Sequence, residues 1–155
     1  AVLNISESSL LSPPPSLPAY PSLPLVTISA RIESELSSLA PEDRELYMKE
    51  IGLAQSGLEK LITAAYQKLG LISFFSTRSN ECRAWTIKQG TKAQGAAGVI
   101  HTDFAKHFIK AKVCSVAEFL KYGGWKGVSE AGRLRLEGKD YIMQEGDVCE
   151  FMVGV

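Results

Sequence analysis

Two histidines, one aspartate and three lysines lie between residues 96 and 113, and these residue types can do acid–base, metal or anion-binding chemistry. His101 and Asp103 are two residues apart, so they point the same way on a strand but not on a helix. Nucleophilic catalysis would require a serine or cysteine on the far side of His101, and the adjacent Thr102 has poor geometry for that role. A metal site would need a third ligand, and His107 is the only other histidine. We therefore predict no catalytic residue and no metal site here.

The same residues are also typical of the end of a helix, which would give them no catalytic or metal-binding role. There, Asp103 or Thr102 would hydrogen-bond the exposed backbone groups, and Phe104 would anchor the turn in the core. A second interpretation adds a binding role to this structural one, with His101 and the nearby lysines forming part of a contact surface. The sequence leaves both interpretations open.

The composition is that of a soluble globular protein, with 45% hydrophobic and 22% charged residues in a chain of 155. That length holds one domain, or one domain and a fragment of another. No apolar run approaches the roughly 20 residues of a membrane helix and no secretory signal is recognisable, so we expect no membrane partner. The chain opens inside an apolar strand pattern without an initiator methionine, which predicts that it is part of a longer protein.

The three cysteines, Cys82, Cys114 and Cys149, are far apart and odd in number, which argues against a disulfide framework and against a zinc site. Each lies in an apolar, strand-like run, so we predict three buried free thiols. A reducing compartment follows, either the cytoplasm or an organelle matrix.

The zero net charge hides a basic segment. Residues 83–139 contain 11 of the 17 lysines and arginines but only 4 of the 17 acidic residues. Such an excess predicts an anionic partner, and contacts with RNA phosphates would give an affinity that falls steeply with salt. Trp125, beside two glycines and Lys126, is expected to be exposed and able to stack on bases, whereas Trp85 is expected in the core. The candidate contacts with RNA or the ribosome are Lys88, Lys92, His101, Lys106, Lys110, Lys112, Trp125, Arg133, Arg135 and Lys139. The alternative is a solvated basic face with no ligand.

The first half of the chain predicts two short strands followed by three helices. Apolar, β-branched residues predict the strands at 1–4 and 25–28. Between them lie six of the seven prolines, four of them at every third position, which predicts a polyproline II edge or a stiff linker over residues 12–24. The last helix begins with a capping box formed by Ser56 and Glu59, and it carries one apolar face. The helices are expected at about 31–39, 41–51 and 57–69.

After Gly70 the hydrophobic period changes from helical to strand-like. Strands are expected at 71–76, 82–87 and 108–116, a helix at 91–100 and a helical turn at 116–122. The third of these strands would place Phe108, Lys110 and Lys112 on one side. Residues 139–153 predict two strands around a Gln-Glu-Gly-Asp hairpin turn. Together these elements predict a small α+β sheet with one main helix across it.

Residues 71–155 closely resemble the C-terminal TGS domain of the Obg-like ATPases, the YchF group. The motifs that carry the resemblance are RAWTIKQGTKA at 83–93, AAGVIHTDF at 96–104, FIKA at 108–111 and AGRLRLEGKDYIMQEGDV at 131–148. The resemblance implies a β-grasp, ubiquitin-like fold, and it implies contact with the ribosome or its RNA.

Residues 1–70 resemble the end of the nucleotide-binding domain of the same family, which implies a remnant of an α/β P-loop domain. The segments SARIESELSSL at 29–39 and GLAQSGLEKLITAAYQKLGLISFF at 52–75 look like its final helices and its exit into the TGS domain, and LNISE at 3–7 looks like its base-recognition motif. The resemblance implies that Asn4 and Glu7, with Ser29 and Ala30 in a second loop, would contact the base of a bound nucleotide, with a preference for ATP. The proline-rich stretch replaces a helical connection that is usual in the family.

The sequence contains no Gly-x-x-x-x-Gly-Lys-Ser/Thr phosphate loop and no Asp-x-x-Gly switch. Phosphoryl transfer depends on these parts, so we expect no hydrolysis and no cofactor for this chain alone, whereas ATP and Mg²⁺ are implied for the complete protein. We predict the TGS-bearing part of an Obg-like ATPase, a monomer that contacts the ribosome or RNA as a regulatory module. The alternative is a protein-interaction module that uses the β-grasp sheet or the proline-rich edge.

Overall fold

The structure is a computed structural model that describes residues 1–12, 25–78 and 81–154. The chain divides into two compact units, residues 1–68 and 69–155, and each is described here by itself. The proline-rich segment, and with it the predicted polyproline II edge, lies outside the described residues.

The first unit contains a two-stranded parallel sheet followed by three helices. Strand β1 (Val2–Asn4) pairs with β2 (Val26–Ile28) in parallel, so the carboxyl ends of both strands lie at the same edge. The remaining elements are η1 (Glu7–Ser9), α1 (Ala30–Ser38), α2 (Pro41–Glu50) and α3 (Gly57–Leu69). Helix α2 begins with proline and two acidic residues, which suit a first helical turn because proline needs no hydrogen-bond partner there and acids favour the positive end of the helix dipole.

Helix α3 begins with the predicted capping box. The backbone N–H of Glu59 donates to Ser56 Oγ at 3.1 Å, and the backbone N–H of Ser56 donates to Glu59 Oε2 at 3.0 Å. The apolar face that we expected to pack is not buried in the described structure, because Leu58 and Ile62 each expose about half of their surface.

The second unit is built around a five-stranded sheet. Its strands are β3 (Leu71–Arg78), β4 (Glu81–Lys88), β5 (Phe108–Ser115), β6 (Arg135–Glu137) and β7 (Asp147–Val153). They follow the order β4-β3-β7-β5-β6, in which the central pair β3–β7 is parallel and every other pair is antiparallel. A central parallel pair of terminal strands, flanked by antiparallel strands and crossed by a helix, is the β-grasp arrangement that we predicted.

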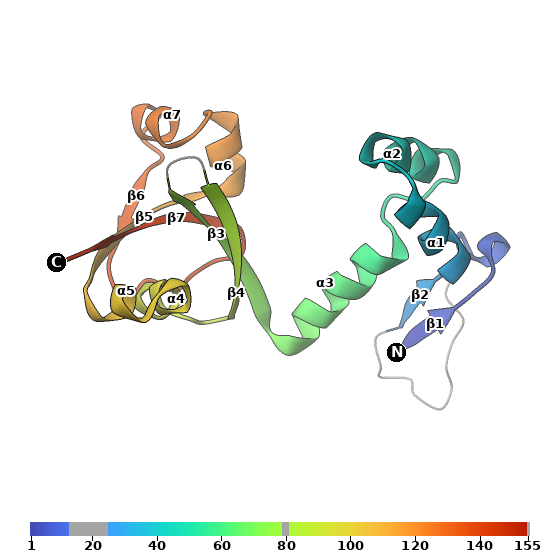
Figure 1. Ribbon diagram of the computed structural model, residues 1–155, viewed down its shortest axis with the longest axis horizontal. Helices are drawn as coiled ribbons and strands as arrows, with labels where there is room; N and C mark the ends of the chain where they lie inside the picture. The colour runs from blue at the N-terminus through green and yellow to red at the C-terminus, as the bar shows by residue number, and fades with distance from the viewer. Residues whose placement is uncertain (13–24, 79–80, 155) are drawn as a thin grey trace. The chain divides into compact units, whose positions relative to one another are not determined.

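Short helices cover both faces of this sheet. Figure 1 shows the sheet between one pair, α4 (Ala93–Ile100) with α5 (Thr102–Lys106), and a second pair, α6 (Val116–Lys121) with α7 (Trp125–Glu130). Helix α7 was not predicted from the sequence.

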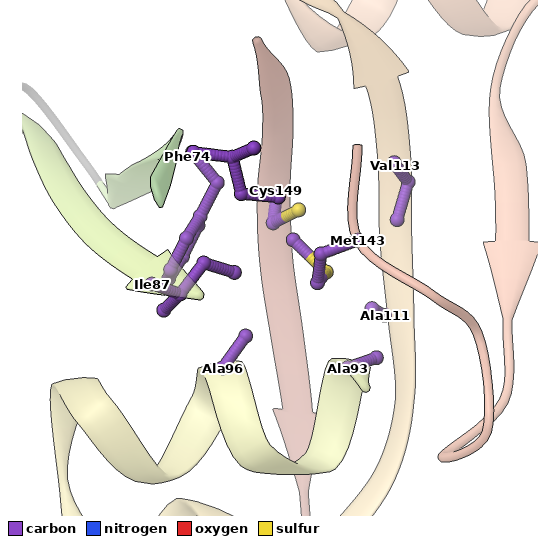
Figure 2. Packing of buried hydrophobic residues seen from close by; sticks show 9 residues of the cluster. Phe74, Ile87, Ala93, Ala96, Ala111, Val113, Met143 and Cys149 are labelled. Atoms are coloured by element: carbon purple, nitrogen blue, oxygen red, sulfur yellow. The ribbon is translucent and has the colours of Figure 1, made fainter. Parts of the chain in front are cut away.

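The larger hydrophobic core lies between α4 and the sheet. Ala93 and Ala96 of α4 are fully buried, and their small side chains let the helix approach the strands closely. Figure 2 shows these alanines facing Met143, Phe74 of β3 and Val113 of β5, all of which are nearly or fully inaccessible to solvent. The small-residue run in the sequence is therefore a packing surface.

A second core lies between the sheet and the α6–α7 pair, and Trp125 belongs to it. Its ring packs edge-on against Phe119 with centroids 5.3 Å apart, and its indole N–H donates to Thr77 Oγ1 at 2.7 Å. The expectation that Trp125 is exposed is therefore wrong, because the two glycines before it turn the chain back onto the sheet. Trp85 packs against the larger core as predicted, and its indole N–H donates to Ser76 Oγ at 2.8 Å.

The predicted hairpin at residues 139–153 is also wrong. Residues 139–146 form no strand, and the nearest strand before β7 is β6 (Arg135–Glu137), which pairs with the other side of β5 and is not a neighbour of β7. The segment between them crosses the unit and forms a single bridge from Ile142 to Lys92. A register shift between Phe108 and Lys110 breaks the predicted alternation of β5, so that Phe108 packs against the core and Ile109 is exposed.

The cysteines differ in exposure, contrary to the prediction of three buried thiols. Cys114 and Cys149 are buried, but Cys82 is exposed because β4 is an edge strand. Burial raises the pKa of the Cys114 thiol to about 11 and also raises the pKa of Cys149, so both are poor nucleophiles at neutral pH.

We expect one thiol of the folded chain to react with DTNB at pH 8 and all three to react in denaturant. The reagent must reach a thiolate, and Cys82 is exposed, whereas Cys114 and Cys149 are buried and burial raises the pKa of both thiols. The absorbance of released thionitrobenzoate counts the reactive groups, and a Cys82→Ser variant is the control with an expected count near zero. Rapid reaction of a second thiol in the native state would contradict the packing described above.

Candidate functional site

A candidate base-binding site lies where β1 and β2 end side by side. Asn4 is the last residue of β1, and Ser29 directly follows β2. The Asn4 side chain accepts a hydrogen bond from the backbone N–H of Ala30, with Oδ1 and N 3.0 Å apart. Ser29 is almost completely buried. Ligands of α/β domains bind at the carboxyl ends of parallel strands, so the structure places Asn4, Ser29 and Ala30 at a suitable edge.

Glu7, the fourth predicted base-site residue, lies in η1 beside the same edge. Its carboxylate is 3.6 Å from the guanidinium of Arg31, and Arg31 also contacts Glu35 at 3.1 Å. Tyr47 donates a hydrogen bond to Glu35, and this bond, with the bond from Arg31, lowers the pKa of the Glu35 carboxyl group. Arg31 was missed from the sequence, and it forms an exposed ion pair with Glu7 while donating its hydrogen bond to Glu35. Asn4 and Glu7 offer amide and carboxylate oxygens, which can accept hydrogen bonds from the amino group of a base.

His101 has a structural role at the start of α5. Its Nδ1 accepts a hydrogen bond from the backbone N–H of Asp103 at 3.2 Å, so the imidazole caps the helix. The ring also packs near Phe104, with centroids 5.9 Å apart. The predicted helix end is confirmed, although the capping group is His101 and neither Thr102 nor Asp103.

Four of the predicted cationic contacts form ion pairs with carboxylates. The ammonium groups of Lys92, Lys106 and Lys112 lie 2.7, 3.3 and 2.9 Å from a carboxylate oxygen of Asp140, Asp103 and Glu150 respectively, and Arg135 lies 3.2 Å from Asp147. Ion pairs between exposed groups contribute little to stability, so the three lysines can exchange their partners at small cost.

The other four cations have no carboxylate within 4.0 Å among the described residues: they are Lys88, Lys110, Arg133 and Lys139. The eight predicted cationic contacts do not lie together on one face of the sheet. Lys112 is paired with Leu136 and Val113 with Arg135, so Arg135 lies on the α4 side of the sheet and Lys112 on the opposite side.

The densest grouping is on the α6–α7 side of the sheet, beyond the part that these helices cover. Lys110 and Lys112 of β5 lie there, next to Met152 and Glu150 of β7. Leu136 of β6 is the other neighbour of Lys112 and is 58% exposed. We call these residues, Lys110, Lys112, Leu136, Glu150 and Met152, the open sheet face.

Asp147 is a buried residue that the sequence analysis did not single out. It is 3% exposed, and its two oxygens accept hydrogen bonds from Arg135 at 3.2 Å and from the Tyr141 hydroxyl and the Gln144 backbone N–H at 2.9 Å each. Burial and the bond to Asp147 raise the pKa of Tyr141 to about 12. The network fixes the segment between β6 and β7, which carries no regular structure of its own. In the sequence, Asp147 was noted only as part of a Gly-Asp turn signal, which does not indicate burial.

A groove of about 660 Å³ opens on the α4 side of the sheet, and it too was not predicted. Its walls include Arg83 and Trp85 of β4, Ile100 of α4 and Phe104 of α5. In the described parts of the chain, no three His, Cys, Asp or Glu side chains come together as a possible metal site. None of the described helices is both long and apolar enough to cross a membrane.

Fold and site together define a β-grasp unit that follows a unit of two parallel strands and three helices. The YchF-GTPase_C family model, described as "Protein of unknown function (DUF933)", matches residues 71–154. The chain therefore belongs to the YchF family of Obg-like ATPases.

Relatives and a solved structure agree with this assignment. The chain is 44% identical over 131 residues to the "Ribosome-binding ATPase YchF" of Bacillus subtilis, which covers 84% of the chain and 36% of the relative. It is 42% identical over 130 residues to "Obg-like ATPase 1" of Saccharomyces cerevisiae, covering 84% and 33%. The structure of the Schizosaccharomyces pombe YchF GTPase superposes with a TM-score of 0.80 at 32% identity, covering 97% of the chain and 42% of that protein. The chain thus spans about a third of the length of these curated relatives.

Proposed function

We propose that this chain is the ribosome-contacting C-terminal part of a YchF-type ATPase, and that its open sheet face touches ribosomal RNA. The relatives' names supply the kind of partner. The observation that supports this surface is the pair Lys110 and Lys112 on one face of β5, flanked by the exposed apolar side chains of Leu136 and Met152.

The chemistry of this face suits a nucleic-acid backbone. Lys110 has no carboxylate neighbour among the described residues, and Lys112 can leave Glu150 for a phosphate because their ion pair is partly exposed. Each phosphate contact releases condensed counterions, so binding should weaken as salt rises. The predicted contacts Lys88, Arg133 and Lys139 lie elsewhere on the unit and would contribute only to a more extensive interface.

In the complete protein, we propose that Asn4, Glu7, Ser29 and Ala30 contact the base of a bound ATP. The Glu7 carboxylate can accept hydrogen bonds from an exocyclic amino group, while Asn4 holds the second loop through Ala30. The phosphate loop and the Mg²⁺ ligands would belong to other parts of that protein, since this sequence has no such motif. A ribosome partner also implies that the protein works in the compartment where translation takes place.

We expect a Lys110→Ala/Lys112→Ala variant to bind purified ribosomes about tenfold more weakly than the unmodified chain at physiological salt, because two phosphate contacts are lost. Co-sedimentation with ribosomes measures the bound fraction. The matched control is Lys121→Ala/Lys126→Ala, which removes the same charge from α6 and α7 outside the open sheet face. Equal weakening by both variants would show that only net charge matters and would contradict the assignment.

A further inference from the structure

The groove on the α4 side of the sheet runs beside an edge strand. Among the described strands, β4 has a neighbour on one side only, β3. All residues of β4 except Trp85 and Ile87 are exposed. Along such an edge, alternate backbone N–H and C=O groups point away from the sheet, which makes it a template for another extended segment.

The side chains of β4 that line the groove have the two-residue period of a strand. Glu81, Arg83 and Trp85 all line it, and all three therefore lie on the same face of β4. The opposite wall is formed by Ile100 and Phe104, where α4 meets α5. An extended chain paired with the free edge of β4 would thus place every second side chain beside these three residues, on the face of the sheet where the groove opens.

The lining offers one apolar position and two charged ones. The indole N–H of Trp85 is already bonded to Ser76, so its ring presents apolar surface. Arg83 and Glu81 are 3.2 Å apart and 65% and 72% exposed, so their ion pair is weak and each can exchange its partner for a residue of a bound segment.

We propose that β4 binds an extended peptide segment of a partner protein, which joins the sheet as an additional strand. The segment carries a bulky apolar residue against Trp85, then an acidic residue opposite Arg83 and a basic residue opposite Glu81, at every second position. Main-chain hydrogen bonds provide affinity in this mode of binding, and alternate side chains provide specificity.

The charge of the groove favours a peptide over RNA. Among the described lining residues, Arg83 is the one cation and Glu81 is the carboxylate beside it on β4, while the carboxylate of Glu150 lies 2.9 Å from Lys112 on the opposite face of the sheet. A polyanion would meet no net positive charge there, whereas a peptide with an acidic and a basic residue can match both Arg83 and Glu81. The three β4 side chains of the peptide site lie on the α4 side of the sheet and Lys110 and Lys112 on the other side, although Glu150 and Met152 also line the groove.

The test is a titration of the isotope-labelled full chain with a synthetic peptide, Thr-Phe-Thr-Asp-Thr-Lys-Thr, and with its reversed sequence, followed by NMR amide shifts. At least one of the two should shift the amides of β4 and of the α4–α5 corner. Arg83→Glu should weaken binding about tenfold, and a peptide with lysine in place of aspartate should restore it. Two N-methylated peptides, modified at alternate positions, should differ, because only one set of peptide N–H groups faces β4.

Three results would overturn the proposal. The first is that neither peptide shifts the β4 amides. The second is that both N-methylated peptides bind like the parent, which would exclude strand addition. The third is that a ten-nucleotide single-stranded RNA shifts the same amides and displaces the peptide. The proposed ribosome contact is tested separately, because Arg83→Glu should leave ribosome co-sedimentation unchanged and Lys110→Ala/Lys112→Ala should leave peptide binding unchanged.

Discussion

Replacement of Asp147 by alanine is expected to lower the free energy of unfolding of the β-grasp unit by about 3–5 kcal/mol, as is typical when one partner of a buried ion pair is removed. Asp147 is 3% exposed and accepts three hydrogen bonds, so its loss leaves the Tyr141 hydroxyl and the Gln144 N–H without their acceptor, while Arg135 keeps only Glu137 at 3.5 Å. The network also holds the irregular segment before β7, together with backbone hydrogen bonds between that segment and Thr91, Ala93 and Ser73. We therefore expect both reduced stability and loosening of that segment.

Urea unfolding followed by tryptophan fluorescence measures this effect, since Trp85 and Trp125 both lie in the second unit. Asp140→Ala is the matched control, because its exposed ion pair with Lys92 should contribute at most about 1 kcal/mol. Asp147→Asn keeps the size of the side chain but removes its charge, and it should fall between the two. A loss below about 1 kcal/mol for Asp147→Ala would mean that the network is not buried as described.

Gly127→Ala is expected to destabilise the same unit by about 1–3 kcal/mol, the range seen when atoms are forced into a packed site. A Cβ atom at this position would lie 1.9 Å from the backbone oxygen of Tyr122 and 2.9 Å from its carbonyl carbon. Backbone atoms cannot move aside as a flexible side chain can, so α6 and α7 would have to separate. That separation would disturb the core around Val128 and Phe119.

Gly138→Ala is the control for this prediction, because a Cβ atom there meets nothing within 4 Å. Its stability should stay within about 0.5 kcal/mol of the unmodified chain. Thermal unfolding followed by circular dichroism compares the two variants directly. Similar melting temperatures for Gly127→Ala and Gly138→Ala would contradict the close approach of α6 and α7.

Capping residues and hydrophobic periodicity correctly predicted those helices and strands that depend mainly on residues close in sequence. The capping box at Ser56 and Glu59 formed as expected, because both partners lie within one helical turn. The small residues of α4 and the alternating apolar residues of β3 and β4 gave the correct element types. The β-grasp fold itself followed from the family resemblance, since strand order depends on pairings that no local pattern encodes.

The errors concern long-range pairing and solvent exposure. A turn signal before Asp147 suggested a hairpin, but β5 takes both β6 and β7 as partners, and this choice is made by tertiary packing. Exposure of Cys82 depends on β4 being an edge strand, and burial of Trp125 depends on the sheet face beneath α7. Asn4 and Ser29 lie at the carboxyl ends of β1 and β2, and their role in base binding stays a prediction, whereas Arg31, the Asp147 network and the groove beside β4 required coordinates.

The salt dependence of ribosome binding tests the central claim most directly. The logarithm of the association constant of the unmodified chain should fall linearly with the logarithm of salt concentration, and the Lys110→Ala/Lys112→Ala variant should show a slope smaller in magnitude by about 1.5, since two phosphate contacts are lost. A slope that the variant leaves unchanged, or an affinity that does not depend on salt, would contradict the assignment of RNA contact to the open sheet face.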